Sequence, residues 1–302
     1  MTPITQWNIR SILQWIKNKF EQKGIETSLL DAQLLICHAL QINKVQLYMD
    51  LERPLNENEK IILRDFVKRR LSNEPVSYIT NKKYWYDLEL YVDNRVLIPR
   101  PETECILDHC YDFFVLKNKM EPKFIFDFCT GSGCLAIALA RMFPCCFVVA
   151  VDVSQDALDV ATKNIEKYKL ENRIYTEKLD LCDEKSFEYL KSKYSQPNLI
   201  VANPPYVTRD EWKELRADVK NFEPQISLVD EEEGLKIAKK IVNFVVTLNS
   251  CDFFIMELSP TQPKILKTEI SLNSKNIENQ NQKKIYFYQD LDGNKRFFSL
   301  HS

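Results

Sequence analysis

The sequence predicts an α/β fold in which a helical domain precedes a doubly wound, mostly parallel sheet of seven strands. Two observations predict it. From about residue 104 onward, short apolar runs alternate with segments of helical periodicity, as in successive βαβ units. Between residues 4 and 73, apolar residues recur at the spacing of amphipathic helices. The chain has 302 residues, which is long enough for two domains of unequal size.

Residues 1–74 are expected to form a helical bundle. One apolar stripe, which ends near Gly24, consists of Ile4, Trp7, Ile12, Leu13, Trp15 and Ile16. The sequence Ser28-Leu-Leu-Asp31 resembles a capping box that would open a second helix through Leu40. A further helix over 61–71 ends on Lys68-Arg69-Arg70, where cations complement the helix dipole. That triplet is either a solvated helix end or a patch for a ribonucleoprotein or acidic partner.

Residues 75–98 change to the period of a strand and are expected to form a β-hairpin that links the two domains. Apolar and polar residues alternate around Trp85, Leu88, Leu90 and Val92. Asp93-Asn94 then provide the turn before a second apolar run, 95–98. The expected domains are therefore 1–74, 75–98 and 99–302.

The last of these domains should hold the sheet. A helix is expected from Glu104, and others at 132–142 and 154–168. The expected strands are 124–128, 147–151, 174–179, 198–202 and 252–257, followed by an antiparallel pair at 284–288 and 296–300. The segment 271–284 is rich in Asn, Ser, Lys and Gln and is expected to be a solvated connection.

Composition excludes several classes of function. The formal net charge of −2 gives no overall basic field of the kind that nucleic-acid binding favours. Nine cysteines and three histidines show no zinc spacing, so we expect reduced thiols and no metal. No apolar stretch approaches the ~20 residues of a membrane helix, and no secretory signal is evident. We expect a cytoplasmic, monomeric protein without membrane or direct nucleic-acid partners.

A glycine turn at Asp127-Phe-Cys-Thr-Gly-Ser-Gly133 predicts a nucleotide-like cofactor site. It leaves a strand and opens a helix, where glycines let the backbone approach a ligand. Asp152 ends the next strand, the position that binds a ribose diol. Because Ala136 replaces the third glycine of the dinucleotide pattern, S-adenosylmethionine, which has no pyrophosphate, fits better. The expected cofactor-binding residues are Asp127, Cys129, Thr130, Gly131, Ser132, Gly133, Asp152, Asp180, Leu181 and Asn203.

Within that set, Asp180 could accept a hydrogen bond from the adenine amino group while Leu181 packs on the adenine ring. The alternative for Asp180 is a helix N-cap. The product would be S-adenosylhomocysteine, and no metal is needed.

Asn203-Pro204-Pro205-Tyr206 follows the fourth expected strand and predicts a site that grips a planar NH2 group. The Asn203 side-chain carbonyl and the Pro204 backbone carbonyl can each accept one N–H. Two prolines stiffen the turn, and Tyr206 offers a flat apolar face. We expect Asn203, Pro204 and Tyr206 to be catalytic and all four residues to bind substrate. The reaction would be methylation of an amide or amino nitrogen.

Together these motifs resemble the release factor glutamine N5-methyltransferases over nearly the full chain. The resemblance is carried also by Glu74–Thr80, Leu97–Glu104, Phe222-Glu223-Pro224 with Glu233-Gly234-Leu235, Glu257 with Gln262, and Asp290–Arg296. It implies a class I S-adenosylmethionine-dependent, Rossmann-like methyltransferase domain. The implied substrate is the glutamine of the Gly-Gly-Gln loop in class I peptide chain release factors, modified at its side-chain amide N5. A helical N-terminal domain would contact the release factor.

Other substrates stay open. Asn81, where glycine is usual, and the cysteines Cys129 and Cys134 lean toward a sister family that methylates a glutamine of a large-subunit ribosomal protein. Adenine N6 in DNA or RNA presents a similar NH2 group, but would need a flipped base and a basic channel. A cofactor-sensing or ribosome-assembly binding module could keep the glycine turn without Asn203.

Overall fold

The computed structural model describes residues 7–273 and 283–301. By compactness the chain divides into two units, Met1–Lys82 with Ala217–Phe222, and Lys83–Arg216 with Glu223–Ser302. Ile4 and most of the expected solvated connection, 274–282, lie outside the described residues. The beginning of that connection, up to Asn273, belongs to a helix.

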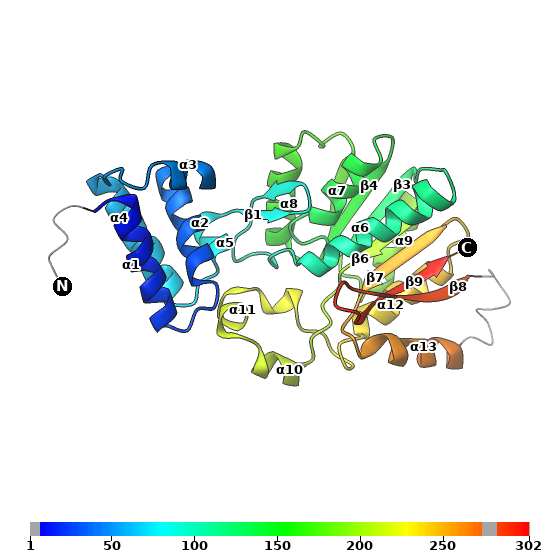
Figure 1. The fold of residues 1–302 in the computed structure, drawn as a ribbon. Helices are drawn as coiled ribbons and strands as arrows, with labels where there is room; N and C mark the ends of the chain where they lie inside the picture. The colour runs from blue at the N-terminus through cyan, green and yellow to red at the C-terminus, as the bar shows by residue number, and fades with distance from the viewer. Residues whose placement is uncertain (1–6, 274–282, 302) are drawn as a thin grey trace. The chain divides into compact units, whose positions relative to one another are not determined.

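The first unit is helical, as predicted (Figure 1). Its helices are α1 (Ile9–Gln22), α2 (Ser28–Leu40), α3 (Lys44–Met49), α4 (Glu57–Leu71), α5 (Val76–Thr80) and α11 (Ala217–Phe222). A core cluster holds the apolar faces of α1, α2 and α4 together, with Phe20, Leu35 and Ile36 fully buried. Three helices begin with reciprocal capping boxes that the sequence analysis missed, on Asn8, Asn43 and Asn56.

The capping box predicted at Ser28–Asp31 is wrong. Ser28 is the first residue of α2, and its N-cap residue Thr27 makes no side-chain capping bond. Asp31 instead accepts a hydrogen bond from Arg70 Nε at 2.7 Å, and both side chains are only 8% exposed. Arg69 pairs with Glu74. Two cations of the basic triplet are therefore engaged inside this unit, which disfavours a patch for a partner.

Replacing Asp31 by alanine should lower the free energy of unfolding by about 3–5 kcal/mol, because it leaves the buried Arg70 guanidinium unpaired. Urea unfolding followed by circular dichroism measures this. The control is Glu21→Ala, which removes the exposed ion pair with Lys17 and should change stability by less than about 1 kcal/mol. Equal losses for both variants would show that the buried pair contributes no more than a surface pair.

The β-hairpin exists, but its position differs from the prediction. It consists of β1 (Lys83–Trp85) and β2 (Leu88–Leu90), with Trp85 paired to Leu88. The reversal lies at Tyr86-Asp87, where Tyr86 takes a positive φ of 51°. A turn does form after Asp93, closed by the hydrogen bond from Val96 N to Asp93 O, but no strand follows it. Residues 76–80 form α5 instead of a strand.

The second unit is built on a seven-stranded sheet of order β5-β4-β3-β6-β7-β9-β8 (Figure 1). Its strands are β3 (Phe124–Phe128), β4 (Phe147–Asp152), β5 (Ile174–Lys178), β6 (Leu199–Ala202), β7 (Phe253–Glu257), β8 (Lys284–Gln289) and β9 (Lys295–His301). The first five are parallel, whereas β9 is antiparallel to β7 and β8. The predicted doubly wound, mostly parallel sheet is confirmed, strand by strand.

Helices cover both faces of the sheet. On one face, α9 (Glu184–Lys193), α12 (Lys236–Val246) and α13 (Gln262–Asn273) close a core around Phe126, Phe128 and Phe254. On the other lie α6 (Glu104–Tyr111), α7 (Cys134–Met142) and α8 (Gln155–Lys167). The strand order reverses between β3 and β6. The loops that follow these two strands therefore lead in opposite directions from a switch point, where such sheets bind ligands.

Two further segments complete the unit. A 3-10 turn (Pro101–Thr103) leads into α6, and a π-helix (Asp112–Lys117) follows that helix. The short helix α10 (Arg209–Glu214) and a 3-10 turn (Gln225–Ser227) lie between β6 and α12. Among the described residues, no helix is long and apolar enough to cross a membrane.

Candidate functional site

A pocket opens at the carboxyl edge of the parallel strands and brings together residues from several predicted motifs. Six of the predicted cofactor-binding residues line it directly: Cys129, Gly131, Asp152, Asp180, Leu181 and Asn203. Pro205, a predicted substrate-binding residue, also lines it. Arg95, Ser154 and Ile226 are among the lining residues that the sequence analysis did not assign to the site. The pocket therefore joins the glycine turn after β3 to the turn after β6, across the switch point.

The glycine turn needs its glycines for two different reasons. Gly131 has a φ of 55°, and a Cβ there would meet no atom within 4 Å, because the position faces the pocket. Gly133 has a φ of 80°, and its Cβ would come within 3.3 Å of the Cβ of Ala161 on α8. Gly131 therefore leaves space for a ligand, whereas Gly133 permits close packing of two elements.

Asp127, Thr130 and Ser132 lie beneath the turn instead of on the pocket wall. Asp127 is fully buried, and its Oδ2 accepts hydrogen bonds from Thr130 Oγ1 at 2.6 Å and from the backbone N–H of Ala136 at 3.1 Å. Burial raises the pKa of Asp127 to about 7. Asp127 Oδ1 and Ser132 Oγ are buried without a hydrogen-bond partner. These residues hold the turn against the start of α7.

Asp152 lies on the pocket wall at the end of β4. Its Oδ2 accepts the backbone N–H of Gly131 at 2.9 Å, and its Oδ1 accepts that of Ser154 at 3.0 Å. Each carboxylate oxygen has a second acceptor direction, so the pair of oxygens can also receive two hydroxyl donors. Burial raises the pKa of Asp152, while the backbone N–H groups oppose that shift. A ribose diol fits this arrangement.

Asp180 and Leu181 line the pocket from the loop after β5. The alternative that Asp180 caps a helix is wrong. The N-cap residue of α9 is Asp183, whose side chain accepts the N–H of Lys185. Asp180 Oδ1 accepts the N–H of Cys182 at 2.8 Å, which fixes the carboxylate beside the buried Leu181 side chain. The two side chains suit a ring with an exocyclic amino group.

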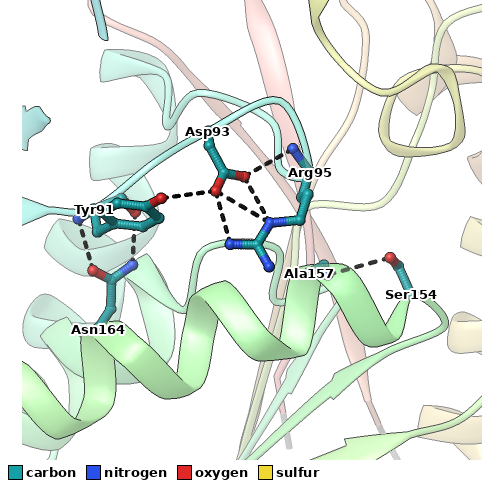
Figure 2. A network of polar contacts seen from close by, with 6 residues as sticks. All are labelled: Tyr91, Asp93, Arg95, Ser154, Ala157 and Asn164. Atoms are coloured by element: carbon teal, nitrogen blue, oxygen red, sulfur yellow. Dashed lines mark hydrogen bonds and ion pairs between the residues drawn. The ribbon is translucent and has the colours of Figure 1, made fainter. Parts of the chain in front are cut away.

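Residues 95–97 line another wall of the pocket, and Figure 2 shows how the segment that leads to them from Tyr91 is held in place. Asn164 on α8 accepts the backbone N–H of Tyr91, and its Nδ2 donates to the carbonyls of both Tyr91 and Ser132. Asp93 holds the Arg95 guanidinium through Nε and through Nη2, the latter at 2.7 Å. Among the described residues that line the pocket, Arg95 is the only cation.

The Asn-Pro-Pro-Tyr turn after β6 is fixed by a buried hydrogen-bond chain. Asn203 Nδ2 donates to Thr103 Oγ1 at 3.0 Å, and Thr103 Oγ1 donates to Glu257 Oε2 at 2.6 Å. Tyr206 Oη donates to Glu257 Oε1 at 3.1 Å. Burial raises the pKa of the Glu257 carboxyl, and burial next to that carboxylate raises the pKa of Tyr206.

Gln262 forms a second set of contacts that stabilise the Asn-Pro-Pro-Tyr turn. Gln262 Nε2 donates to the carbonyl of Tyr206 at 2.8 Å and to the carbonyl of Glu233 at 2.9 Å. Gly234, with a φ of 73°, lies so close that a Cβ would be 2.5 Å from Gln262 Nε2 and closer still to Tyr206 O. Only glycine allows this approach of the two backbones.

The sequence analysis assigned no site role to Arg95, Thr103 or Glu257. Thr103 and Glu257 stood in segments that carried the family resemblance, which was the available signal for them. Arg95 stood in the expected hairpin. Among the described residues, no group of His, Cys, Asp and Glu is arranged to hold a metal ion.

Family models match both parts of the chain. A model described as the PrmC N-terminal domain matches residues 11–80. A model described as RNA cap guanine-N2 methyltransferase matches residues 122–289, the part that contains the parallel strands and most of the residues that line the pocket.

Solved structures share the fold. The N-terminal domain of human METTL16 in complex with SAH has a TM-score of 0.51 at 18% identity, covering 70% of this chain and 74% of that chain. The hMettl16 catalytic domain in complex with MAT2A 3'UTR hairpin 6 has a TM-score of 0.53 at 17% identity, with the same two coverages. At such identities the likeness shows a methyltransferase fold alone.

Curated relatives extend the similarity over the full chain. A release factor glutamine methyltransferase of Rhodopirellula baltica is 32% identical over 98% of this chain and 97% of its own length. One of Leptospira interrogans is 32% identical over 97% and 98%. One of Chlorobaculum tepidum is 37% identical over 74% and 76%. Because these similarities include both the helical region and the pocket of the α/β unit, the chain belongs to the release factor glutamine methyltransferase family.

Proposed function

We propose that this protein transfers a methyl group from S-adenosylmethionine to the side-chain amide N5 of the glutamine in the Gly-Gly-Gln loop of class I peptide chain release factors. The observation that carries the proposal is the orientation of Asn203. Its amide nitrogen is engaged by Thr103, so its carbonyl oxygen is the atom left for a substrate N–H, at a pocket with a diol-binding carboxylate.

The residues of the pocket fit S-adenosylmethionine. Gly131 leaves room for the ligand where a Cβ would project, and Asp152 would hold the ribose hydroxyls. Asp180 and Leu181 would receive the adenine amino group and ring. Arg95, whose guanidinium Asp93 holds in place, would pair with the methionine carboxylate. When bound, the cofactor supplies a methyl group on a positively charged sulfur, and S-adenosylhomocysteine is its product.

The chain's own residues would prepare the nucleophile. An amide nitrogen is a poor nucleophile because its lone pair is delocalised into the carbonyl. Asn203 Oδ1 and the Pro204 carbonyl would each accept one N–H of the glutamine, which turns the lone pair toward the methyl group. Pro205 stiffens the turn, and the Tyr206 ring would hold the amide plane. Such alignment can lower the activation free energy of methyl transfer by several kcal/mol, up to ~7–11 kcal/mol at the extreme.

The domains would divide the work between recognition and chemistry. In this proposal the helical residues 1–74 contact the release factor. Residues 75–98 link the domains and supply Arg95 to the cofactor pocket, and 99–302 provide the rest of the cofactor site and carry out the transfer. The protein would act as a monomer in the cytoplasm, where translation termination takes place.

Replacing Asp152 by alanine should weaken cofactor binding by ~1.5–3 kcal/mol, because a charged acceptor for two hydroxyls is lost. Isothermal titration calorimetry with S-adenosylhomocysteine measures the change. The matched control is Asp159→Ala on the exposed face of α8, where the carboxylate bonds only to Gln155 among the described side chains. An unchanged affinity of the Asp152 variant would remove this residue from the cofactor site.

The test of the function is mass spectrometry of purified release factor and ribosomal proteins after incubation with this protein and S-adenosylmethionine. A gain of one methyl on the glutamine of Gly-Gly-Gln is expected. A methyl group found instead on a large-subunit ribosomal protein would show that the substrate is different but that the reaction is the proposed one. In a parallel incubation of DNA or RNA with labelled S-adenosylmethionine, nuclease-sensitive label, with no methyl group gained by any of the proteins, would overturn the glutamine assignment. Absence of transfer to any of these would overturn the enzymatic proposal itself.

A further inference from the structure

We propose that Thr103 and Glu257 are positioning residues that lock the carboxamide of Asn203 with its oxygen toward the substrate. The inference rests on the proposed function, since it concerns how Asn203 presents its acceptor to an NH2 group. Neither residue touches the proposed substrate or cofactor; both would act through Asn203.

The two positioning residues reach Asn203 from separate elements of the second unit. Asn203 follows β6, and Glu257 ends the adjacent strand β7, where Ala202 is paired with Met256. Thr103 comes from the 3-10 turn before α6. Thr103 and Glu257 are 2% and 1% exposed, so water cannot take the place of either partner.

The direction of the hydrogen bonds determines which way the carboxamide faces. Thr103 has a single hydroxyl proton, and it donates this proton to Glu257 Oε2. The Thr103 oxygen can then only accept from Asn203, which requires Nδ2 on that side. Asn203 Oδ1 is thereby turned the other way. With Nδ2 and Oδ1 exchanged, Asn203 would offer a donor to the NH2 group of the substrate and repel it.

Glu257 also controls the other end of the turn. Its second oxygen accepts the hydroxyl of Tyr206, so one carboxylate connects to the first and last residues of Asn-Pro-Pro-Tyr. An apolar side chain would pack in this dry position at lower cost, since burial disfavours a charge. A carboxylate is the group that accepts from two hydroxyls at once without donating. Its role at this place is therefore to set hydrogen-bond direction.

The test compares Thr103→Val, which keeps the shape and removes the hydroxyl, with Thr103→Ser, which keeps the hydroxyl. Thr103→Val should lower kcat for release factor methylation ~10- to 100-fold, with the KM of release factor and the Kd of S-adenosylhomocysteine within a few-fold of wild type. Thr103→Ser should recover most of the loss. The control is Thr247→Val at the end of α12, where the hydroxyl donates to Phe244 O; its kcat should not change.

A double variant separates positioning from general structural damage. In an Asn203→Ala background, Thr103→Val should cause no further loss of kcat, because the carboxamide it orients is gone. An equal further loss in that background would overturn the inference. So would a wild-type kcat for Thr103→Val, or a loss confined to the affinity for the cofactor.

A measurement independent of turnover distinguishes failure of this inference from failure of the proposed function. Protein labelled with ¹⁵N in asparagine should show one side-chain NH2 signal that disappears in Asn203→Ala. The chemical shift of one of its protons should be changed by the hydrogen bond to Thr103. That change should be lost in Thr103→Val and kept in Thr103→Ser. If the wild-type protein methylates no release factor but this pattern holds, the proposed substrate is wrong and the fixed orientation of the Asn203 carboxamide is supported. If Thr103→Val leaves the signal unchanged, the positioning role of Thr103 is wrong, whatever the substrate is.

Discussion

Replacing Asn203 by alanine is expected to lower methyl transfer to release factor by at least ~100-fold while the affinity for S-adenosylhomocysteine stays within a few-fold of wild type. Asn203 lies in the pocket, but its carboxamide is held by Thr103 and turned toward the place of the substrate NH2. The acceptor it offers gains strength as the amide nitrogen becomes pyramidal and positive. The loss should therefore appear in the rate constant of methyl transfer, which single-turnover assays measure, and calorimetry should report intact cofactor binding.

The control for this variant is Asn118→Ala, at an exposed position before β3 where the side chain donates to Phe113 O. It should methylate at the wild-type rate. Equal losses of cofactor affinity and turnover in Asn203→Ala would contradict the assignment, because they would place Asn203 in ground-state binding of the cofactor. A small effect on both cofactor affinity and turnover would show that the Pro204 carbonyl alone is enough to orient the substrate NH2 group.

The sheet could be predicted from the sequence because each of its strands carries its own signal. Runs such as 147–151 and 199–202 are apolar over their whole length, as is typical of buried parallel strands, and turn residues bound them. Parallel strands place their carboxyl ends at one edge, so the glycine turn and Asn203 could be expected to meet in one pocket. Local pattern and topology together were sufficient for that part of the site.

Contacts between segments distant in the sequence could not be predicted in this way. Asp31 had the spacing of a capping residue, but its carboxylate is paired with Arg70, thirty-nine residues away. The sequence offers both partners and no means of ranking them, because a buried ion pair depends on how α2 and α4 pack. The hairpin reversal at Tyr86-Asp87 was missed for a related reason, since Asp93-Asn94 carry the stronger turn composition.

The same limit applies within the site. Asp127, Thr130 and Ser132 belong to the glycine-turn motif, and only coordinates distinguish the residues that face the pocket from those that support it. The chain from Asn203 through Thr103 to Glu257 spans three elements, and nothing in the local sequence of any one of them indicates the others. A positioning role of this kind becomes visible only when hydrogen-bond partners are known.

Replacing Gly234 by alanine is expected to have the second large effect, because it would force two backbones apart beside the Asn-Pro-Pro-Tyr turn. The new Cβ would lie 2.5 Å from Gln262 Nε2 and nearer still to the Tyr206 carbonyl oxygen, the two atoms that brace the turn. Overpacking and the positive φ together should lower the free energy of unfolding by about 2–4 kcal/mol. Displacement of Tyr206 should also lower kcat at least ~10-fold, since sub-ångström placement governs the transfer.

Gly293→Ala is the matched control, because Gly293 has a similar φ of 82° but no atom within 4 Å of a Cβ. It should suffer only the backbone strain, ~1–2 kcal/mol, and keep its kcat. The difference between the two variants in urea unfolding and in single-turnover methylation isolates the close approach at Gly234. Equal effects of the two substitutions on stability and on kcat would mean that φ alone requires glycine there. In that case the close approach of Gly234 to Gln262 and Tyr206 would have no bearing on stability or turnover.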